Sequence, residues 1–218
     1  FDIIVGVDND QAALNTFAKN HNGAVSLNAD LSKQETFDEI KRIAGDREID
    51  VVIAGPPCQG FSLTGPRNFD DERNKLYLAV IEIVKQYQPK AFIIENVPGM
   101  ATLYEGQIKD EILHRFEKMG YNIECKILCA ADYGVPQMRK RLIFMGIRKD
   151  IGTPKFPKEK LAPENYLTCR DAVSDLPSLE NDLGTEEAEY NKEPLTDYQK
   201  LMRGNCSILY NHIGTNHT

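Results

Sequence analysis

The 218-residue sequence predicts an α/β fold built on a mostly parallel sheet. Short apolar runs of strand length alternate along the chain with amphipathic stretches of helical length. Two of these runs lead directly into an acidic residue, at Asp8 and at Glu95. Because the carboxyl ends of parallel strands meet at one edge of an open α/β sheet, where ligands bind, we expect these polar residues to gather at that edge.

In the first third of the chain, the residue patterns predict three strands and two helices. Asn9 and Asp10 are residue types that accept hydrogen bonds from the first amides of a helix, so a helix is expected after them. The apolar run 51–54 is bounded by a charge and by Gly-Pro, which is typical of a strand buried on both faces. The predicted strands are 1–8, 24–27 and 51–54, and the second predicted helix is 37–44.

The middle of the chain continues this alternation. Pro89 and Gly120 each follow an apolar-periodic stretch and end it, as these residue types do after helices. From about Leu179 the sequence turns acidic and polar, and no packed domain is predicted there. The predicted helices are 76–86 and 107–119, and the predicted strands are 91–94, 121–131 and 141–147, of which the last two flank a turn at 133–137.

The composition indicates an ordinary globular protein, with 41% hydrophobic and 27% charged residues. No stretch is long and apolar enough to span a membrane, and no signal-peptide pattern is present. The five cysteines lack Cys-x-x-Cys pairs, so neither a disulfide framework nor a metal site is expected. We therefore expect a reduced setting, cytoplasmic in a bacterium or otherwise intracellular.

The net charge of −7 disfavours nucleic acid as a partner, because phosphate contacts dominate that affinity. However, residues 180–193 hold six acids and one lysine and account for most of the imbalance. A local basic surface and ordinary solvated charges therefore both stay open. The basic residues near the motifs described next are Arg67, Arg73, Lys75, Arg139, Lys140, Arg141, Arg148 and Lys149.

A cysteine motif, Pro56-Pro-Cys-Gln-Gly-Phe-Ser62, follows the predicted strand 51–54. The two prolines lack backbone donors and end the strand in a stiff turn, which places Cys58 at the edge where such sheets carry chemistry. A lone cysteine is otherwise most often a small buried residue. Two further motifs come later, Glu95-Asn-Val97, which starts 37 residues after the cysteine, and Gln137-Met-Arg-Lys-Arg141.

The three motifs, in this order, resemble those of the cytosine-C5 DNA methyltransferases. The resemblance covers roughly residues 1–178 and implies a Rossmann-like S-adenosylmethionine-dependent methyltransferase fold with an antiparallel hairpin. It implies methyl transfer to C5 of a cytosine flipped out of double-stranded DNA, in a restriction-modification system. Residues 1–178 would then be the catalytic domain, and 179–218 the start of a target-recognition region.

The resemblance also implies roles for individual residues in catalysis. Cys58 would attack C6 of the base as a thiolate, and Glu95 would bind N3. Arg141 would hold O2 of the base, while Arg139 would orient Glu95 or a nearby phosphate. The implied substrate-binding residues are Pro56, whose carbonyl would accept from the N4 amino group, and Gln59, Ser62 and Gln137.

For S-adenosylmethionine, the resemblance implies that Asp8 binds the ribose and that Asp30 reads the adenine amino group. On the residues alone, Asp8 is equally well explained as a helix cap and Asp30 as the start of an Asx turn. The other implied cofactor-binding residues are Asn9, Leu31, Gly55, Pro57 and Leu76.

Two departures from the family pattern lie at the ends of the chain. The family's Phe-x-Gly-x-Gly loop would precede Phe1, and its last motif would follow Thr218. We therefore expect a truncated chain that binds S-adenosylmethionine weakly or not at all and associates through the unpaired edge of the strand that ends at Asp8.

Two alternative functions stay open. A tRNA cytosine-C5 methyltransferase would carry Pro-Phe-Thr after Cys58-Gln59, where this chain has Gly60-Phe-Ser62. A non-catalytic, methyltransferase-like regulatory fragment is disfavoured by the presence of Cys58, Glu95 and Arg141. A dehydrogenase is unsupported, because no Gly-x-Gly-x-x-Gly follows any predicted strand.

Overall fold

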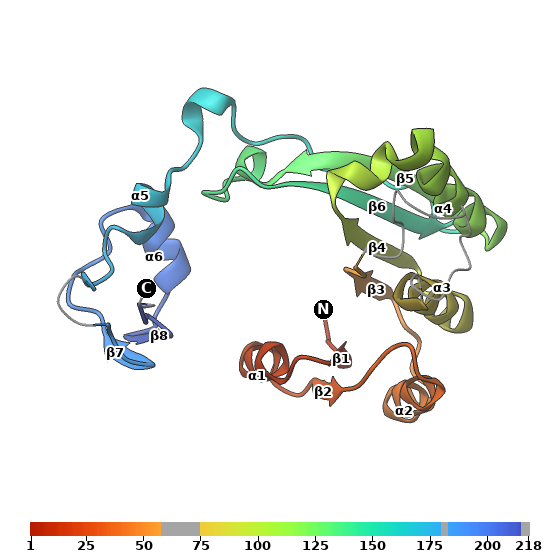
Figure 1. Cartoon of the computed structure of the whole chain (residues 1–218), viewed down its shortest axis with the longest axis horizontal. Helices are drawn as coiled ribbons and strands as arrows, with labels where there is room; N and C mark the ends of the chain where they lie inside the picture. Colours follow the sequence, from red (N-terminus) through yellow and green to blue (C-terminus); the bar gives the residue numbers. More distant parts are fainter. Residues whose placement is uncertain (58–74, 180–182, 215–218) are drawn as a thin grey trace. The chain divides into compact units, whose positions relative to one another are not determined.

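The computed structural model describes residues 1–57, 75–179 and 183–214. The chain packs as two units, which Figure 1 shows and which are treated separately below. The first unit comprises Phe1–Leu128 and Arg141–Phe156, and the second comprises Cys129–Lys140 and Pro157–Thr218. Within the described ranges, no helix is long and apolar enough to cross a membrane.

The first unit begins with two parallel strands and two helices. These elements are β1 (Val5–Asp8), α1 (Gln11–Asn20), β2 (Val25–Asn28) and α2 (Gln34–Ala44). In the β1–β2 pair, Asp8 lies opposite Asn28, so both strands end at the same edge. Asp10 caps α1, because its side chain accepts from the amide of Ala12 at 2.8 Å and from that of Ala13 at 3.4 Å. The predicted cap is therefore confirmed.

A four-stranded sheet forms the centre of the first unit. Its strands are β3 (Val51–Ala54), β4 (Ala91–Asn96), β5 (Tyr121–Cys129) and β6 (Lys140–Arg148), in the order β3-β4-β6-β5. β3 and β4 run parallel, whereas β4 and β6 run antiparallel. The α/β class, the mostly parallel pairing and the antiparallel portion are confirmed. β4 extends to Asn96, so Glu95 lies inside the strand and not after it.

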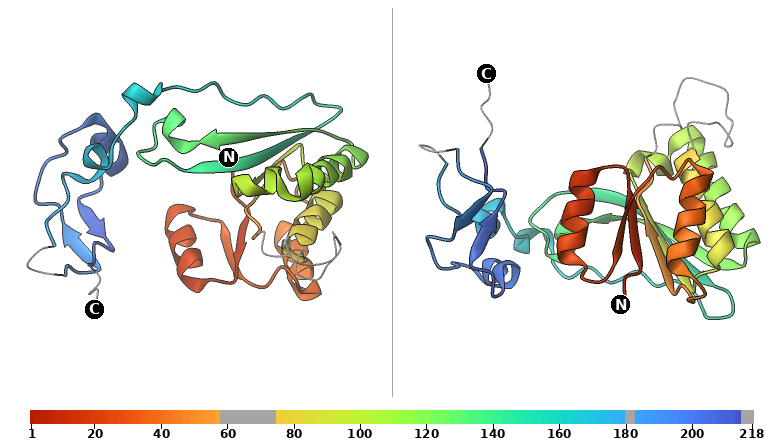
Figure 2. Two further views of the ribbon diagram at one scale, coloured as in Figure 1. Left: turned by 45° about the horizontal axis from the view of Figure 1, so that its top comes forward. Right: turned by 90° about the horizontal axis from the view of Figure 1, so that it is seen from below.

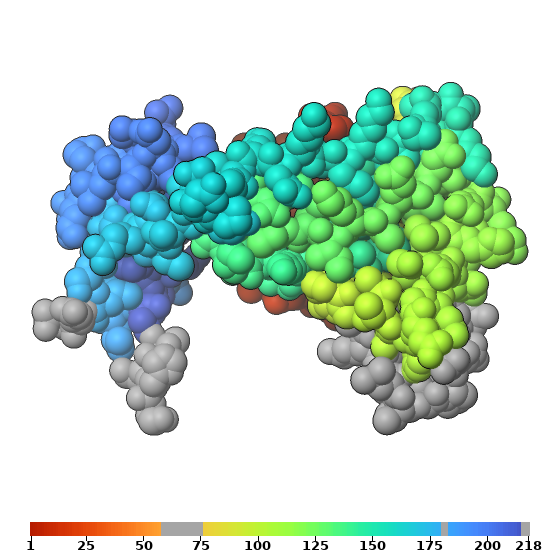
Figure 3. Space-filling view, turned by 90° about the horizontal axis from the view of Figure 1, so that it is seen from above, coloured from red at the N-terminus to blue at the C-terminus, as the bar shows by residue number. Residues whose placement is uncertain are grey.

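Helices α3 (Lys75–Tyr87) and α4 (Gln107–Lys118) cover one face of this sheet (Figure 2). In the space-filling view, the yellow-green surface of α4 adjoins the green surface of β5 (Figure 3). Burial alternates along β4, where Phe92, Ile94 and Asn96 face the helices. Glu95 therefore faces the other side of the sheet. The buried core residues are Tyr77, Val80, Val84, Phe92, Ile94, Met100, Ile108, Ile112, Phe116, Tyr121, Leu142 and Phe144.

The face of the sheet opposite these helices differs from the prediction at β3. The sequence predicted a strand buried on both faces, but the Ile53 side chain is 75% exposed. Val52 and Ala54 point the other way and pack against the core. In the part of the chain that the structure describes, β3 is therefore covered on one face only.

The second unit contains two short helices and a small antiparallel strand pair. Its elements are α5 (Cys169–Val173), β7 (Glu187–Glu189), α6 (Asp197–Arg203) and β8 (Ile208–Tyr210). Both helices begin with a capping box, formed by Thr168 with Asp171 and by Thr196 with Gln199. The sequence predicted no packed domain after about Leu179, and the structure has β7, α6 and β8 there. The packing of these elements does not test whether residues 1–178 are a catalytic domain and 179–218 the start of a target-recognition region. That assignment stays a prediction.

Single-turn 3-10 helices connect these elements in both units. They are Pro98–Ala101 and Leu103–Gly106 in the first unit, and Ala130–Tyr133 and Pro163–Asn165 in the second.

Candidate active site

The candidate site lies at the carboxyl ends of β3 and β4. The two strands run in register, with Ala54 opposite Ile94. Beyond this pair, the Glu95 carboxylate approaches the glycine that follows β3, since a Cβ atom on Gly55 would lie 3.6 Å from Glu95 Oε2. The structure therefore brings together Gly55 and Glu95, two predicted site residues that are 40 positions apart in the sequence.

Arg141 reaches the same edge from β6. Its Nε atom donates to Glu95 Oε1 at 2.5 Å, and the side chains of Arg141 and Glu95 are 25% and 40% exposed. Glu95 pairs with Ile143 across the antiparallel ladder, so Arg141 projects from the same face two residues earlier on β6. Arg141 is thus in contact with Glu95, while the role that the resemblance gives to Arg139, orienting Glu95 or a nearby phosphate, stays a prediction.

Asn96 fixes the turn that follows β3. Its side-chain amide donates to the carbonyl of Pro56 at 3.0 Å, and its side-chain oxygen accepts from the amide of Val97 at 2.9 Å. Both Asn96 and Pro56 are buried. Sequence reasoning gave Asn96 no role, although it stands beside Glu95 in a recognised motif. The Pro56 carbonyl, expected to accept from the base, already accepts one hydrogen bond from Asn96.

Three predicted site residues, Cys58, Gln59 and Ser62, lie outside the described residues. The turn can be followed as far as Pro57, which is exposed. Their roles stay predictions.

The predicted adenosine-binding acids lie at the ends of β1 and β2. Asp8 is exposed, and its carboxylate accepts from the amide of Asp10 at 2.9 Å. The Asp8 carbonyl accepts from Ala29 at 3.0 Å, which brings the end of β1 beside the residue before Asp30. The Asp30 carboxylate accepts from the amide of Ser32 at 2.8 Å and so forms the Asx turn that the residues alone suggested. Asp8 itself is not the cap of α1, since Asp10 has that role.

A further polar pair near this edge was missed by sequence reasoning. The Asn28 amide donates to the side-chain oxygen of Gln11 at 2.7 Å. Gln11 begins α1 and Asn28 ends β2, so they meet only in the folded unit and no local pattern signals them. Among the other predicted cofactor residues, Asn9 is exposed, while Leu31 and Leu76 are half-buried.

Gln137 and Arg139 belong to the second unit, in the turn between β5 and β6. The Arg139 amide donates to the Gln137 carbonyl at 2.9 Å, and its carbonyl accepts from the amide of Ala130 at 2.9 Å. These bonds order the backbone of the turn. The roles given to both side chains stay predictions.

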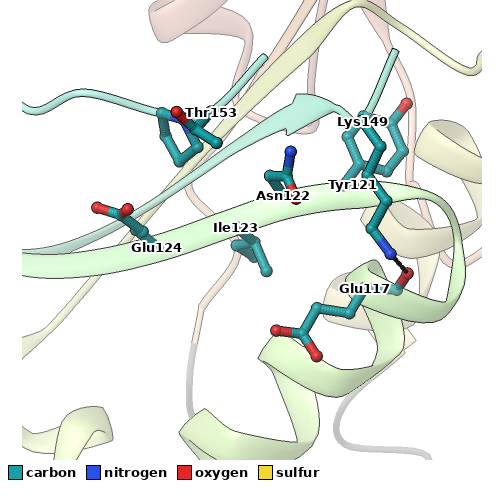
Figure 4. A pocket seen from close by; sticks show the side chains of 8 residues that line it. Glu117, Tyr121, Asn122, Ile123, Glu124, Lys149 and Thr153 are labelled. Atoms are coloured by element: carbon teal, nitrogen blue, oxygen red, sulfur yellow. Dashed lines mark hydrogen bonds between the residues drawn. The ribbon is translucent and has the colours of Figure 1, made fainter. Parts of the chain in front are cut away.

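A hollow of about 350 Å³ lies at the opposite end of the sheet from Glu95 (Figure 4). It lies where β5 begins and β6 has ended, and Lys149 donates across it to the carbonyl of Glu117 at 3.0 Å. None of the predicted site residues lines it. The lining residues are Glu117, Tyr121, Asn122, Ile123, Glu124, Lys149, Thr153 and Pro154.

Comparison with protein families gives a match over nearly the whole chain. Residues 1–215 match the family model described as C-5 cytosine-specific DNA methylase. Among curated proteins, the Type II methyltransferase M.DdeI of Desulfomicrobium norvegicum is 35% identical over 100% of this chain and 53% of its own length. The Type II methyltransferase M1.HphI of Haemophilus parahaemolyticus is 40% identical over 83% of this chain and 43% of its own length. The chain thus spans about half the length of these curated relatives.

Solved structures give the same picture of the fold. An E. coli prophage protein assigned as a DNA modification methyltransferase superposes with a TM-score of 0.72 at 27% identity, covering 98% of this chain and 60% of its own. The S. pombe Dnmt2 methyltransferase superposes with a TM-score of 0.59 at 20% identity, covering 84% of this chain and 55% of its own. The second likeness concerns the fold alone.

Proposed function

The chain belongs to the C-5 cytosine-specific DNA methylase family, and we propose that the protein transfers a methyl group from S-adenosylmethionine to C5 of cytosine in double-stranded DNA. The observation that carries this proposal is the Glu95–Arg141 pair, held at the end of β4 beside the turn that leads to Cys58. The target cytosine must leave the helix, because its C6 atom is inaccessible to a thiolate inside the stack.

Cys58 supplies the nucleophile in this proposal. C5 of cytosine is too weak a nucleophile to attack a methyl sulfonium, so the thiolate first forms a bond to C6. This addition turns the ring into an enamine, in which C5 is nucleophilic. C5 takes the methyl group, after which loss of the C5 proton to a base or water and breakage of the C6–S bond restore the aromatic ring. The Cys58 thiolate is regenerated at the end of the cycle.

Glu95 stabilises the covalent adduct. Addition at C6 shifts negative charge toward N3, and a carboxyl that shares a proton with N3 offsets that charge. Arg141 holds this carboxyl through its 2.5 Å contact, so the group is oriented before the base arrives. Ordering a catalytic group in advance lowers the cost of reaching the transition state.

The ends of β1 and β2 fit the adenosine part of S-adenosylmethionine. The exposed Asp8 carboxylate suits the ribose hydroxyls, and Asp30 suits the adenine amino group, since both partners donate hydrogen bonds. When bound, S-adenosylmethionine supplies the electrophilic methyl group. Asn9, Leu31, Gly55, Pro57 and Leu76 complete the set proposed for this pocket.

Double-stranded DNA is the proposed partner, in a bacterial restriction-modification system and therefore inside the cell. Relatives named as Type II methyltransferases support this assignment. We also propose that the 218-residue chain self-associates through β1, which within the described residues pairs on one side only, with β2. Sedimentation of the chain at several concentrations tests this, and a monomer throughout would contradict it.

Covalent trapping tests the proposed activity. The full-length protein should form a stable adduct with a duplex containing 5-fluorocytosine at the target base, because fluorine cannot leave as the C5 proton does. Cys58→Ser should abolish both the adduct and methyl transfer, since an alcohol is scarcely ionised at neutral pH. Cys169→Ser is the control, because Cys169 is an exposed cysteine outside the motif, and this variant should keep both. An adduct that survives Cys58→Ser would exclude this mechanism.

A further inference from the structure

Asn96 is a buried polar residue on an otherwise apolar face of β4. Only 4% of its surface is exposed, and its neighbours on that face, Phe92 and Ile94, are fully buried. Burying an amide is unfavourable unless its hydrogen bonds are made. Both polar atoms of the Asn96 side chain are hydrogen-bonded: the nitrogen donates to the Pro56 carbonyl, and the oxygen accepts from the Val97 amide.

The sequence of the turn explains why a side chain is needed there. The β3–β4 ladder ends at the Ala54–Ile94 pair, and the residues after Gly55 are both prolines. Proline has no backbone N–H, so Pro56 and Pro57 offer only carbonyl oxygens to the neighbouring strand. The Asn96 amide donates to the Pro56 carbonyl and so connects β4 to the turn beyond the last ladder bond.

We infer that Asn96 is a positioning residue, which fixes the turn leading to Cys58 relative to Glu95. The inference rests on the proposed function. Glu95 and Asn96 are consecutive on β4, so their side chains point to opposite faces of the same strand. One residue carries the carboxyl that contacts the base, while the next holds the turn that delivers the nucleophile.

The kinetic consequence is specific. Misplacing a reacting group by about 1 Å can cost about 100-fold in rate, without weakening the binding of substrate. Loss of the Asn96–Pro56 bond should therefore reduce kcat and the rate of adduct formation. The KM values for DNA and S-adenosylmethionine should change little, because Asn96 lies in the core with only 4% of its surface exposed.

Two substitutions at this position test the inference in the full-length protein. Asn96→Asp keeps the shape of the side chain and the acceptor for Val97, but an ionised carboxylate cannot donate to Pro56. Asn96→Ala removes both bonds and adds no charge, so it serves if the aspartate variant fails to fold. For each variant, single-turnover methyl transfer and trapping by 5-fluorocytosine are measured per folded molecule. We expect both rates to fall about 10- to 100-fold, with KM changed by less than about twofold.

Tyr121→Phe is the matched control. The Tyr121 hydroxyl donates to the Pro89 carbonyl at 2.7 Å, another buried bond from a side chain to a proline carbonyl, at the opposite end of β4. Its removal should lower the thermal midpoint but leave kcat unchanged. The inference about Asn96 would be overturned if both Asn96 variants kept native rates, or if Tyr121→Phe lost as much kcat as they do. Neither result would affect the proposed function. A native protein that forms no adduct would overturn the proposed function as well.

Discussion

Phe92 on β4 lies directly opposite Gly146 on β6, and its ring occupies the space that a side chain at residue 146 would need. A Cβ atom added to Gly146 would lie 2.1 Å from the ring of Phe92. The ring is fully buried and packs against Phe116 and Tyr121, with centroid distances of 4.2 and 5.1 Å. The glycine therefore leaves the space on β6 that the Phe92 ring occupies.

We expect Gly146→Ala to lower the free energy of unfolding by about 1–3 kcal/mol, because the ring must move within a close-packed core. Urea unfolding followed by circular dichroism measures this. Gly99→Ala is the control, since no atom lies within 4 Å of its added Cβ. In the Phe92→Leu background, Gly146→Ala should cost much less. If Gly146→Ala lowers the free energy of unfolding equally in both backgrounds, the Phe92 ring does not cause the destabilisation.

A buried ion pair should stabilise the second unit. Arg203 contacts Asp175, and their side chains are only 11% and 4% exposed. Arg203 also donates to the carbonyl of Lys192 at 2.8 Å and lies 3.7 Å from the ring centroid of Tyr190. We expect Asp175→Ala to destabilise this unit by about 3–5 kcal/mol, because it leaves a buried guanidinium without its carboxylate. Hydrogen exchange at the amides of β7 and β8 measures the change.

The exposed pair of Lys200 and Asp197 in the same unit provides the comparison. Lys200→Met should cost no more than about 1 kcal/mol, since solvent screens exposed pairs. If Lys200→Met and Asp175→Ala have equal effects, burial does not determine the strength of the Arg203 pair.

Sequence reasoning located most of the first unit but little of the second. β3 was placed at its observed bounds, because a short apolar run between a charge and Gly-Pro allows few alternatives. β7 and β8 have three residues each, which is too short for any period to show. Their pairing depends on contacts between residues far apart in the chain.

Sequence reasoning also predicted only part of the candidate site. Motif order indicated Glu95 and Arg141 as site residues, but only the antiparallel pairing of β4 with β6 puts them in contact. The hydrogen bond from Asn96 to Pro56 links residues 40 positions apart, so no local sequence pattern indicates it. The exposure of Ile53 was missed because an apolar run predicts a strand and does not say what covers each face.

Tyr121 should make the first unit sensitive to alkaline pH. Burial raises the pKa of its hydroxyl to about 12, compared with an ordinary value of 10. Because the pKa is higher in the folded state, the resulting stability is fully present below pH 10 and is lost as the pH rises toward 12. We expect the free energy of unfolding to fall across this window, and to fall less in Tyr121→Phe. Identical pH profiles for the two proteins, measured by urea unfolding, would contradict this assignment.

The contact between Glu95 and Arg141 leads to a prediction about coupling in catalysis. Glu95→Gln should lower kcat of the full-length protein about 100- to 10,000-fold, because an amide cannot share a proton with N3 in the same way. Arg141→Lys keeps the charge but lacks the planar guanidinium that holds Glu95, and we expect a loss of about 10- to 100-fold.

If Arg141 acts through Glu95, the two losses are not additive, and Arg141→Lys should cost little once Glu95 is replaced. Single-turnover methyl transfer by the four proteins of this double-mutant cycle measures the coupling. Arg148→Lys is the control, since Arg148 pairs with Asp150 at 2.7 Å near the opposite end of β6 and should leave the rate unchanged. Fully additive losses would mean instead that Arg141 acts on the base directly, as the resemblance alone implied through O2.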